Sequence, residues 1–279
     1  MTLESTGKKS RGSVSPVRWT IQLIFLAATF LVGLRHILPG EGSKGGAFDA
    51  FCPFGAVETL WSYVTTGETL KTTSPLNFSI ALGVLGVSLL AGRAFCGWMC
   101  PIGTFQDILS GFSTRHFGRF KKPGNKNKLE IPVQITKRSD AWLRSFKYLI
   151  LGVILLASIW AVYPPLYEIC PARAIFSFQL TTTLLWSVLI TFVFTSLLNK
   201  RFWCKYLCPL GAVLVPFNKI SPLRLVLNQE NCTNCNSCEP VCPMDIDDLT
   251  HNLRSAECIQ CLECQKACKV HNSIDLRLF

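Results

Sequence analysis

Cysteines near the C-terminal end of the chain carry the strongest chemical signal in the sequence. They form two runs of identical spacing, each of the form C-x2-C-x2-C-x3-C. The first run is Cys232, Cys235, Cys238 and Cys242, and the second is Cys258, Cys261, Cys264 and Cys268. Pro243 follows the first run and Lys269 the second. Cysteine thiolates at such short spacings can wrap the irons of an iron–sulfur cluster.

The C-x2-C-x2-C-x3-C-P pattern is the signature of bacterial-type two-cluster ferredoxins, in which the fourth cysteine of each run ligates the other cluster. The predicted ligands of cluster I are Cys232, Cys235, Cys238 and Cys268. The predicted ligands of cluster II are Cys258, Cys261, Cys264 and Cys242. Structural zinc fits less well, because zinc sites usually combine two C-x2-C pairs or mix cysteine with histidine. Disulfides would need an oxidising compartment, and the topology predicted below places this segment in the cytosol.

The remaining cysteines all belong to Cys-Pro motifs. Two of these motifs are CxxxCP, formed by Cys96 with Cys100 and by Cys204 with Cys208. The other two are the single pairs Cys52-Pro53 and Cys170-Pro171. Proline is favoured at the first position of a helix, so the cysteine before each proline is predicted at a helix N-cap. A helix N-terminus lowers the pKa of a thiol, which favours the thiolate.

Two interpretations of the CxxxCP cysteines stay open. If the halves of the chain bring them together, they form a site for a further metal or cluster, or for dithiol chemistry. Otherwise they are buried cysteines at tight turns. We predict the functional role, with catalytic residues Cys96, Cys100, Cys204 and Cys208.

Other polar and cysteine candidates give weaker signals. Cys52 and Cys170 form either a disulfide or shared metal site, or are two small apolar side chains without such a role. Gln106 and Asp107 follow the first CxxxCP motif and could hydrogen-bond a quinone. A solvated polar face is the favoured interpretation of these two residues.

Long apolar runs must position these motifs, and 49% of the residues are hydrophobic. Transmembrane helices are predicted at about 19–38, 76–92, 146–163 and 182–198. The fold class is therefore an all-α polytopic membrane domain with four transmembrane helices, plus a small C-terminal bacterial-type two-[4Fe-4S] ferredoxin domain. The predicted divisions are a basic cytoplasmic tail at 1–18, a transmembrane domain at 19–220 and a ferredoxin domain at 221–279. The unit of helix, CP, helix and CxxxCP occurs twice, which indicates two internal repeats.

Basic residues are distributed as in a membrane protein. The formal net charge of +11 could suggest nucleic-acid binding, but Lys and Arg gather beside the apolar runs. Lys and Arg are abundant at the N-terminus and after the second and fourth predicted helices. The positive-inside rule then places both termini in the cytoplasm. We predict a multi-pass protein of a bacterial or archaeal cytoplasmic membrane, in contact with the lipid bilayer and with no nucleic acid partner.

Taken together, the motifs resemble those of the NapH family of membrane ferredoxin-type quinol dehydrogenase subunits. The segments Cys96-Gly97-Trp98-Met99-Cys100-Pro101-Ile102-Gly103 and Cys204-Lys205-Tyr206-Leu207-Cys208-Pro209-Leu210-Gly211 carry the resemblance. They are also similar to segments of NosR-type regulators and CcoG-type copper-reducing assembly factors. The NapH resemblance implies electron transfer between the quinone pool and redox partner subunits, an iron–sulfur protein or a cytochrome. The CcoG resemblance implies the alternative, a metal- or thiol-reducing maturation factor for a respiratory oxidoreductase.

Overall fold

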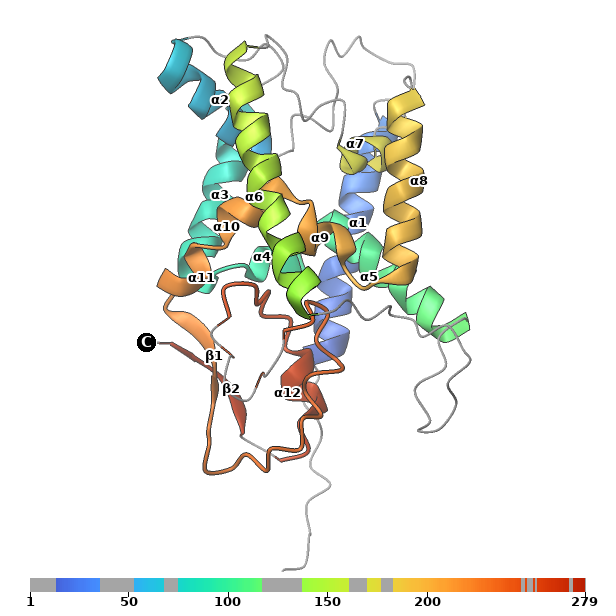
Figure 1. Cartoon of the computed structure of the whole chain (residues 1–279), viewed down its shortest axis with the longest axis vertical. Coiled ribbons are helices and arrows are strands. Elements are labelled where there is room, and N and C mark those ends of the chain that lie inside the picture. The colour runs from blue at the N-terminus through green and yellow to red at the C-terminus, as the bar shows by residue number, and fades with distance from the viewer. Residues whose placement is uncertain are drawn as a thin grey trace, which may run out of the picture.

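Four apolar helices run along the long axis of the molecule in this computed structural model (Figure 1). They are α1 (Val14–Arg35), α3 (Pro75–Ala91), α6 (Lys137–Trp160) and α8 (Thr183–Leu198). The structure describes residues 14–35, 53–67, 75–116, 137–160, 170–176, 183–246, 249, 253, 255–270 and 273–278. Each long helix overlaps one of the predicted transmembrane runs.

Two of these helices are long and apolar enough to cross a membrane within the described part of the chain. Their apolar stretches are Pro16–Leu34 in α1 and Ser139–Ile159 in α6. The helices α3 and α8 are apolar but shorter, with 17 and 16 residues. Four full transmembrane spans are therefore not established by helix length. Large apolar side chains nevertheless project outward from three of the helices, including Leu82 at 74% exposure, Leu156 at 63% and Phe194 at 61%.

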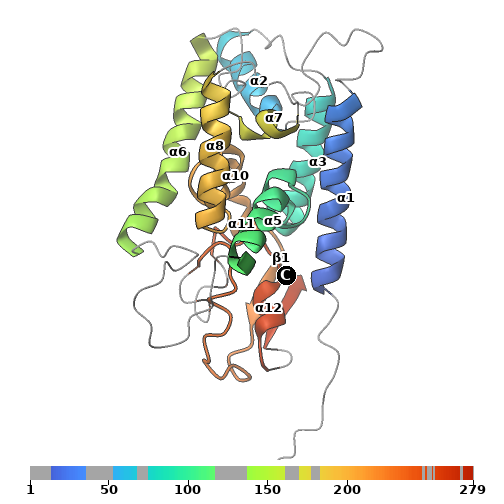
Figure 2. The same ribbon diagram turned by 90° about the vertical axis from the view of Figure 1, so that its right-hand side faces the viewer.

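The Cys-Pro motifs begin helices, as predicted from the position of proline. These helices are α2 (Pro53–Thr66), α5 (Pro101–His116), α7 (Pro171–Phe176) and α10 (Pro209–Leu214). Two short helices, α4 (Ala94–Trp98) and α9 (Phe202–Tyr206), carry the first cysteine of each CxxxCP motif. Both repeats thus contain a long helix, a CP helix, a second long helix, a short helix and a CP helix. Figures 1 and 2 show α2 and α7 at the end of the molecule opposite the C-terminal segment.

The C-terminal segment is closed by two antiparallel strands that enclose both cysteine runs in the sequence. After the short helix α11 (Phe217–Ile220), β1 (Leu223–Leu227) pairs with β2 (Ile274–Leu278). The register joins Leu223 to Leu278 and Leu227 to Ile274. The helix α12 (Glu263–Ala267) lies within the second cysteine run, near the first residues of α1 (Figure 1).

One apolar core joins this segment to the long helices. Met244 and Ile259, from the two cysteine-bearing parts of the segment, are almost fully buried. They belong to the same cluster of buried side chains as Val84 of α3 and Leu214 of α10. The segment therefore packs directly against the helices rather than hanging from a linker, and this contact brings its cysteines to the CxxxCP motifs.

Candidate iron–sulfur and thiol sites

The fourth cysteine of each C-terminal run lies with the first three cysteines of the other run. One cavity is lined by Cys232, Cys235, Cys238 and Cys268. In addition to burial, the charge of Cys242 raises the pKa of its neighbours Cys258, Cys261 and Cys264. These are the two groups expected for interleaved cubane clusters. The assignment of each cysteine as a ligand stays a prediction.

The backbone of both runs turns in the same unusual way. Asn234 and Asn236 have φ values of 49° and 50°, and the equivalent Gln260 and Leu262 have values of 50° and 62°. A left-handed conformation is rare for a bulky residue such as leucine and costs about 1–3 kcal/mol. It turns backbone N–H groups toward sulfur, and the Gln260 amide donates to Sγ of Cys258 at 3.4 Å. Concave arrangements of N–H groups favour anions, so both runs suit a cluster held by thiolates.

No group of three or more His, Cys, Asp and Glu side chains in the described residues is arranged to hold a single metal ion. A cubane cluster differs from a single ion, because it holds its thiolate ligands at separate corners. The grouping of the cysteines and the repeated left-handed turns fit a cluster of this kind better than a mononuclear site.

The two groups of cysteines differ in exposure. Cys235 is exposed, and hydrogen bonds from the side chain and amide of Ser237 lower its pKa to about 7. Burial raises the pKa of Cys258 to about 12 and that of Cys261 to about 11. The cluster I group therefore faces solvent, and the cluster II group is enclosed between the segment and the helices.

The CxxxCP cysteines are brought together, as the repeat predicts. Cys96 and Cys204 are buried, and after burial the charges of Cys208, Cys100 and Cys96 raise the pKa of Cys204. Burial, with a further contribution from Cys96, raises the pKa of Cys100 to about 12 and that of Cys208 to about 11. The expectation that helix N-termini would favour thiolates is therefore wrong for the protein without metal. The Gly211 amide does donate to Sγ of Cys208 at 3.4 Å, but burial outweighs it.

Both CxxxCP motifs contact residues beside the cluster II cysteines. In the first motif, the indole N–H of Trp98 donates to the Gln260 carbonyl at 2.9 Å. A Cβ on Gly97 would stand 2.3 Å from the carbonyl oxygen of Ile259, so only glycine fits. In the second motif, Lys205 forms an ion pair with Asp245, three residues after Cys242. Cluster II would thus lie directly beside the CxxxCP thiols.

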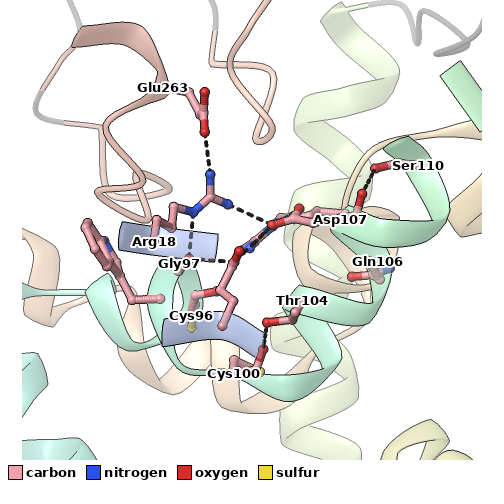
Figure 3. A network of polar contacts seen from close by, with 12 residues as sticks. Arg18, Cys96, Gly97, Cys100, Thr104, Gln106, Asp107, Ser110 and Glu263 are labelled. Atoms are coloured by element: carbon pink, nitrogen blue, oxygen red, sulfur yellow. Dashed lines mark hydrogen bonds and ion pairs between the residues drawn. The ribbon is translucent and has the colours of Figure 1, made fainter. Parts of the chain in front are cut away.

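A buried polar network holds this contact together (Figure 3). Arg18 of α1 donates to the Gly97 carbonyl at 3.1 Å and pairs with Glu263 and Asp107 at 2.7 Å each. Arg201 pairs with both carboxylate oxygens of Asp107, at 2.7 and 2.6 Å. Although burial acts in the opposite direction, Arg201 and Arg18 hold the pKa of Asp107 below its usual value.

The predicted solvated face at Gln106 and Asp107 is therefore wrong. Gln106 is fully buried, donates to Ser196 at 3.0 Å and accepts a hydrogen bond from the Cys204 thiol at 3.1 Å. The Asp107 side chain is 11% exposed, and two arginines from other elements neutralise its charge. Neither partner is close in sequence, so periodicity along α5 could not reveal them.

Two functional candidates, Arg93 and Arg201, were missed by reasoning from the sequence. Each stands three residues before the first cysteine of a CxxxCP motif, and that repeated position is the signal that could have found them. Arg93 pairs with Glu257 at 2.7 Å, directly before Cys258. Arg201 also donates to the Cys96 carbonyl at 2.7 Å.

The outer cysteines stay unassigned. Cys170 lies before α7, half-buried against the cluster of side chains that includes Phe192. Cys52, most of the tail at 1–18 and the basic loop at 117–136 lie outside the described residues. The pairing of Cys52 with Cys170 therefore stays a prediction.

Models of known families match both the regions with the CxxxCP motifs and the C-terminal cysteine runs. A model described as a 4Fe-4S binding domain matches residues 73–119 and again 180–227. These two matches coincide with the second long helix and the CxxxCP motif of each half of the predicted repeat. A model described as a 4Fe-4S dicluster domain matches residues 224–269. No solved structure matches the chain.

Several curated proteins are similar to this chain. It is 26% identical over 231 residues to the putative electron transport protein YccM of Escherichia coli, covering 75% of this chain and 58% of YccM. It is 30% identical over 159 residues to the ferredoxin-type protein NapH of Haemophilus influenzae, covering 54% of this chain and 48% of NapH. It is 25% identical over 221 residues to the methylamine utilization ferredoxin-type protein MauN of Methylobacillus flagellatus, covering 74% of this chain and 67% of MauN. With the duplicated 4Fe-4S match and the dicluster match, these findings show that the chain is similar to ferredoxin-type proteins such as NapH, the family that its motifs resemble, although it spans only about half to two thirds of the length of these relatives.

Proposed function

We propose that this chain is a multi-pass membrane electron-transfer protein that passes electrons between the quinone pool and redox partner proteins. Two [4Fe-4S] clusters would carry the electrons. The observation that carries this proposal is the interleaved grouping of the cysteines. Cys268 shares a cavity with the first run, and Cys242 lies with the second. Zinc or disulfide frameworks would not require this exchange of the fourth cysteine between the runs.

The contacts support an ordered route for the electron. The CxxxCP cysteines follow the long helices α3 and α8 in the sequence, where a quinone in the bilayer would approach. Cluster II would follow, since Trp98 of the first motif hydrogen-bonds the Gln260 carbonyl. Cluster I would come last, beside the exposed Cys235, where a soluble domain of a partner can approach. The structure of the route does not depend on the direction of electron flow.

The helices support a membrane domain at 19–220, between a basic tail at 1–18 and a ferredoxin domain at 221–279. At the usual rise, the 17 residues of α3 span roughly 25 Å, against about 30 Å for the hydrocarbon core. A short span is accommodated by local thinning of the bilayer, so we infer that α3 and α8 cross it together with α1 and α6. Both clusters would lie at the cytoplasmic end. A quinone or a partner subunit must then bridge the membrane to any acceptor on the far side.

Substitution of the fourth cysteine of each run by serine tests the proposal. In the Cys242→Ser variant we expect the EPR signal of the cluster held by Cys258, Cys261 and Cys264 to change or disappear. In the Cys268→Ser variant the other signal should be affected. Each variant is the control for the other, because both lose one fourth-position thiol. If Cys242→Ser selectively removes the signal of Cys232, Cys235 and Cys238, each run closes its own cluster and the interleaved assignment is wrong.

A further inference from the structure

Two buried arginines are related by the internal repeat and cross over between its halves. Arg93 is 1% exposed and Arg201 is 0% exposed. The Nη2 atom of Arg93 lies 3.1 Å from where a Cβ on Gly211, in the second repeat, would stand. The Nη1 atom of Arg201 lies 3.3 Å from the equivalent position on Gly103, in the first repeat. Both glycines stand three residues after the second cysteine of a CxxxCP motif, so each arginine reaches the opposite motif.

The charges around Arg93 do not balance. Arg93 and Lys147 are both buried, and both pair with the single carboxylate of Glu257. The next cation along α6, Arg144, has its own carboxylate in Asp140. The Nε–H of Arg93 is buried and has no hydrogen-bond partner among the residues that the structure describes. A buried positive charge without a full set of partners is costly, so the site is short of one anion.

Beyond their carboxylate partners Glu257 and Asp107, the two guanidinium groups have thiols around them. Against the effect of burial, Cys96 and Cys208 contribute with Glu257 to raising the pKa of Arg93. Arg93 in turn lowers the pKa of Cys258, although burial is the larger influence on that thiol. Cysteines of two sites, the CxxxCP site and cluster II, therefore surround the position beside Arg93 that lacks an anion.

Arg201 has the equivalent position on the other side. Against burial, Asp107 and then Cys204 and Cys261 raise the pKa of Arg201. Arg18 and Arg201 both lower the pKa of Cys261, where burial again dominates. Each repeat arginine thus stands between a CxxxCP motif and one of the two consecutive cysteines, Cys258 and Cys261, of cluster II.

We propose that Arg93 and Arg201 are positioning residues that supply the positive charge against which cluster II accepts an electron. This inference rests on the proposed function, because it requires cluster II. One electron from a reductant adds one negative charge to the cluster. In a buried site of low dielectric constant, a fixed neighbouring cation stabilises that charge, and net charge is one determinant of cluster potential. The arginines would hold the reduction potential of cluster II above the value that it would have without them.

An EPR-monitored dithionite titration of the full-length protein, purified anaerobically, tests the proposal. The signal altered in Cys242→Ser identifies cluster II. In Arg93→Gln we expect about tenfold less reduced cluster II, relative to oxidised, at a fixed ambient potential, which is about 59 mV for one electron. In Glu257→Gln, which removes a negative charge from the same ion pair, the shift should have the opposite sign. Arg93→Lys keeps the charge and should remain closest to the wild-type protein.

Potential shifts of opposite sign in Arg93→Gln and Glu257→Gln would distinguish an effect of charge from structural damage. Loss of packing alone would not change the sign of the shift according to which charge is removed. Arg277→Gln, on the exposed strand β2, removes the same charge at the surface and should leave cluster II unchanged. The proposal is overturned if Arg93→Gln retains its clusters with an unchanged potential, or if Arg93→Gln and Glu257→Gln shift it in the same direction. If Arg93→Gln does not assemble, an unchanged or lowered potential in Glu257→Gln overturns it. Wild-type protein without iron and sulfide would instead contradict the proposed function itself.

Discussion

At the scale of single residues, Asp107 is the carboxylate that pairs with two buried arginines beside the CxxxCP motifs. Its carboxylate accepts hydrogen bonds from Arg18 and Arg201, which are far apart in the sequence. Arg18 extends the network to Glu263 beside the cluster II cysteines. One carboxylate therefore joins α1, α5 and the start of α9 to the ferredoxin segment.

Removal of that carboxylate should be strongly destabilising. Asp107→Ala leaves two buried arginines short of a partner, and breaking a buried ion pair in this way costs about 3–5 kcal/mol. We expect a lower unfolding temperature of the purified protein in detergent and a lower membrane yield. The exposed Glu230 offers a matched control, since Glu230→Ala also removes one carboxylate. Equal unfolding temperatures for the two variants would show that the network contributes little.

The cysteines could be predicted from sequence because their spacing is local, whereas their surroundings could not. The two C-terminal runs and both CxxxCP motifs are visible as letters, and the structure brings each set together. The state of the CxxxCP thiols was predicted wrongly, because burial depends on contacts between distant segments. Arg93, Arg201 and Gln106 acquire their roles from such contacts as well. The sequence shows that an arginine stands at the same position before each CxxxCP motif, but it does not show which ion pairs these arginines form.

At the scale of elements, α4 links the long helices to the backbone beside the predicted cluster II cysteines. Gly97 packs against the carbonyl oxygen of Ile259, and the next residue, Trp98, hydrogen-bonds Gln260. These contacts add to the apolar core and to the ion pairs of α1 and α6 that hold the segment in place. They also locate the step at which electrons would pass between the CxxxCP site and the clusters.

A methyl group at Gly97 should disturb this step. In Gly97→Ala the new Cβ would stand 2.3 Å from the carbonyl oxygen of Ile259, and overpacking of this kind costs about 1–3 kcal/mol. We expect slower reduction of the clusters by a quinol analogue, with both clusters still reduced by dithionite. Gly111→Ala in α5 is the control, because nothing lies within 4 Å of its Cβ position and alanine favours the helix. Equal quinol-linked rates in the two variants would remove α4 from the electron route.

The long helices were predicted more accurately at some ends than at others. The prediction of 182–198 nearly matches α8, and 76–92 nearly matches α3. The helix α6 begins at Lys137, well before the predicted start near 146. Hydropathy misses this first part because it contains the charged residues Asp140 and Arg144. Those charges are tolerated there because they pair with each other, and Arg144 also donates to the backbone carbonyl of Met244, which is far away in sequence.

At the scale of the whole molecule, the ends of the helices give one consistent orientation. The start of α1, the ends of α3 and α8, and the ferredoxin segment lie at the same end (Figures 1 and 2). The helices α2 and α7 lie at the other. In the sequence, basic residues precede α1 and follow α3 and α8, so the positive-inside rule predicts that this end of the helices faces the cytoplasm.

Reporter fusions can test this orientation. Fusions after Phe279 and within residues 111–140 should be active as cytoplasmic reporters, and a fusion near Gly45 should be active as a periplasmic one. A matched pair of reporters, one active on each side of the membrane, provides the control at every site. A periplasmic C-terminus would place the cysteine runs in an oxidising compartment and favour disulfides over clusters.

Cluster reduction by a quinol analogue, compared with reduction by dithionite, tests the central claim most directly. The wild-type protein should contain iron and sulfide for two cubane clusters, and both reductants should reduce them. Serine at Cys96, Cys100, Cys204 or Cys208 should leave the clusters loaded and dithionite-reducible, but abolish quinol-linked reduction. Wild-type clusters that accept no electrons from quinol would contradict membrane electron transfer, and serine variants with the wild-type quinol rate would contradict a relay through the CxxxCP thiols.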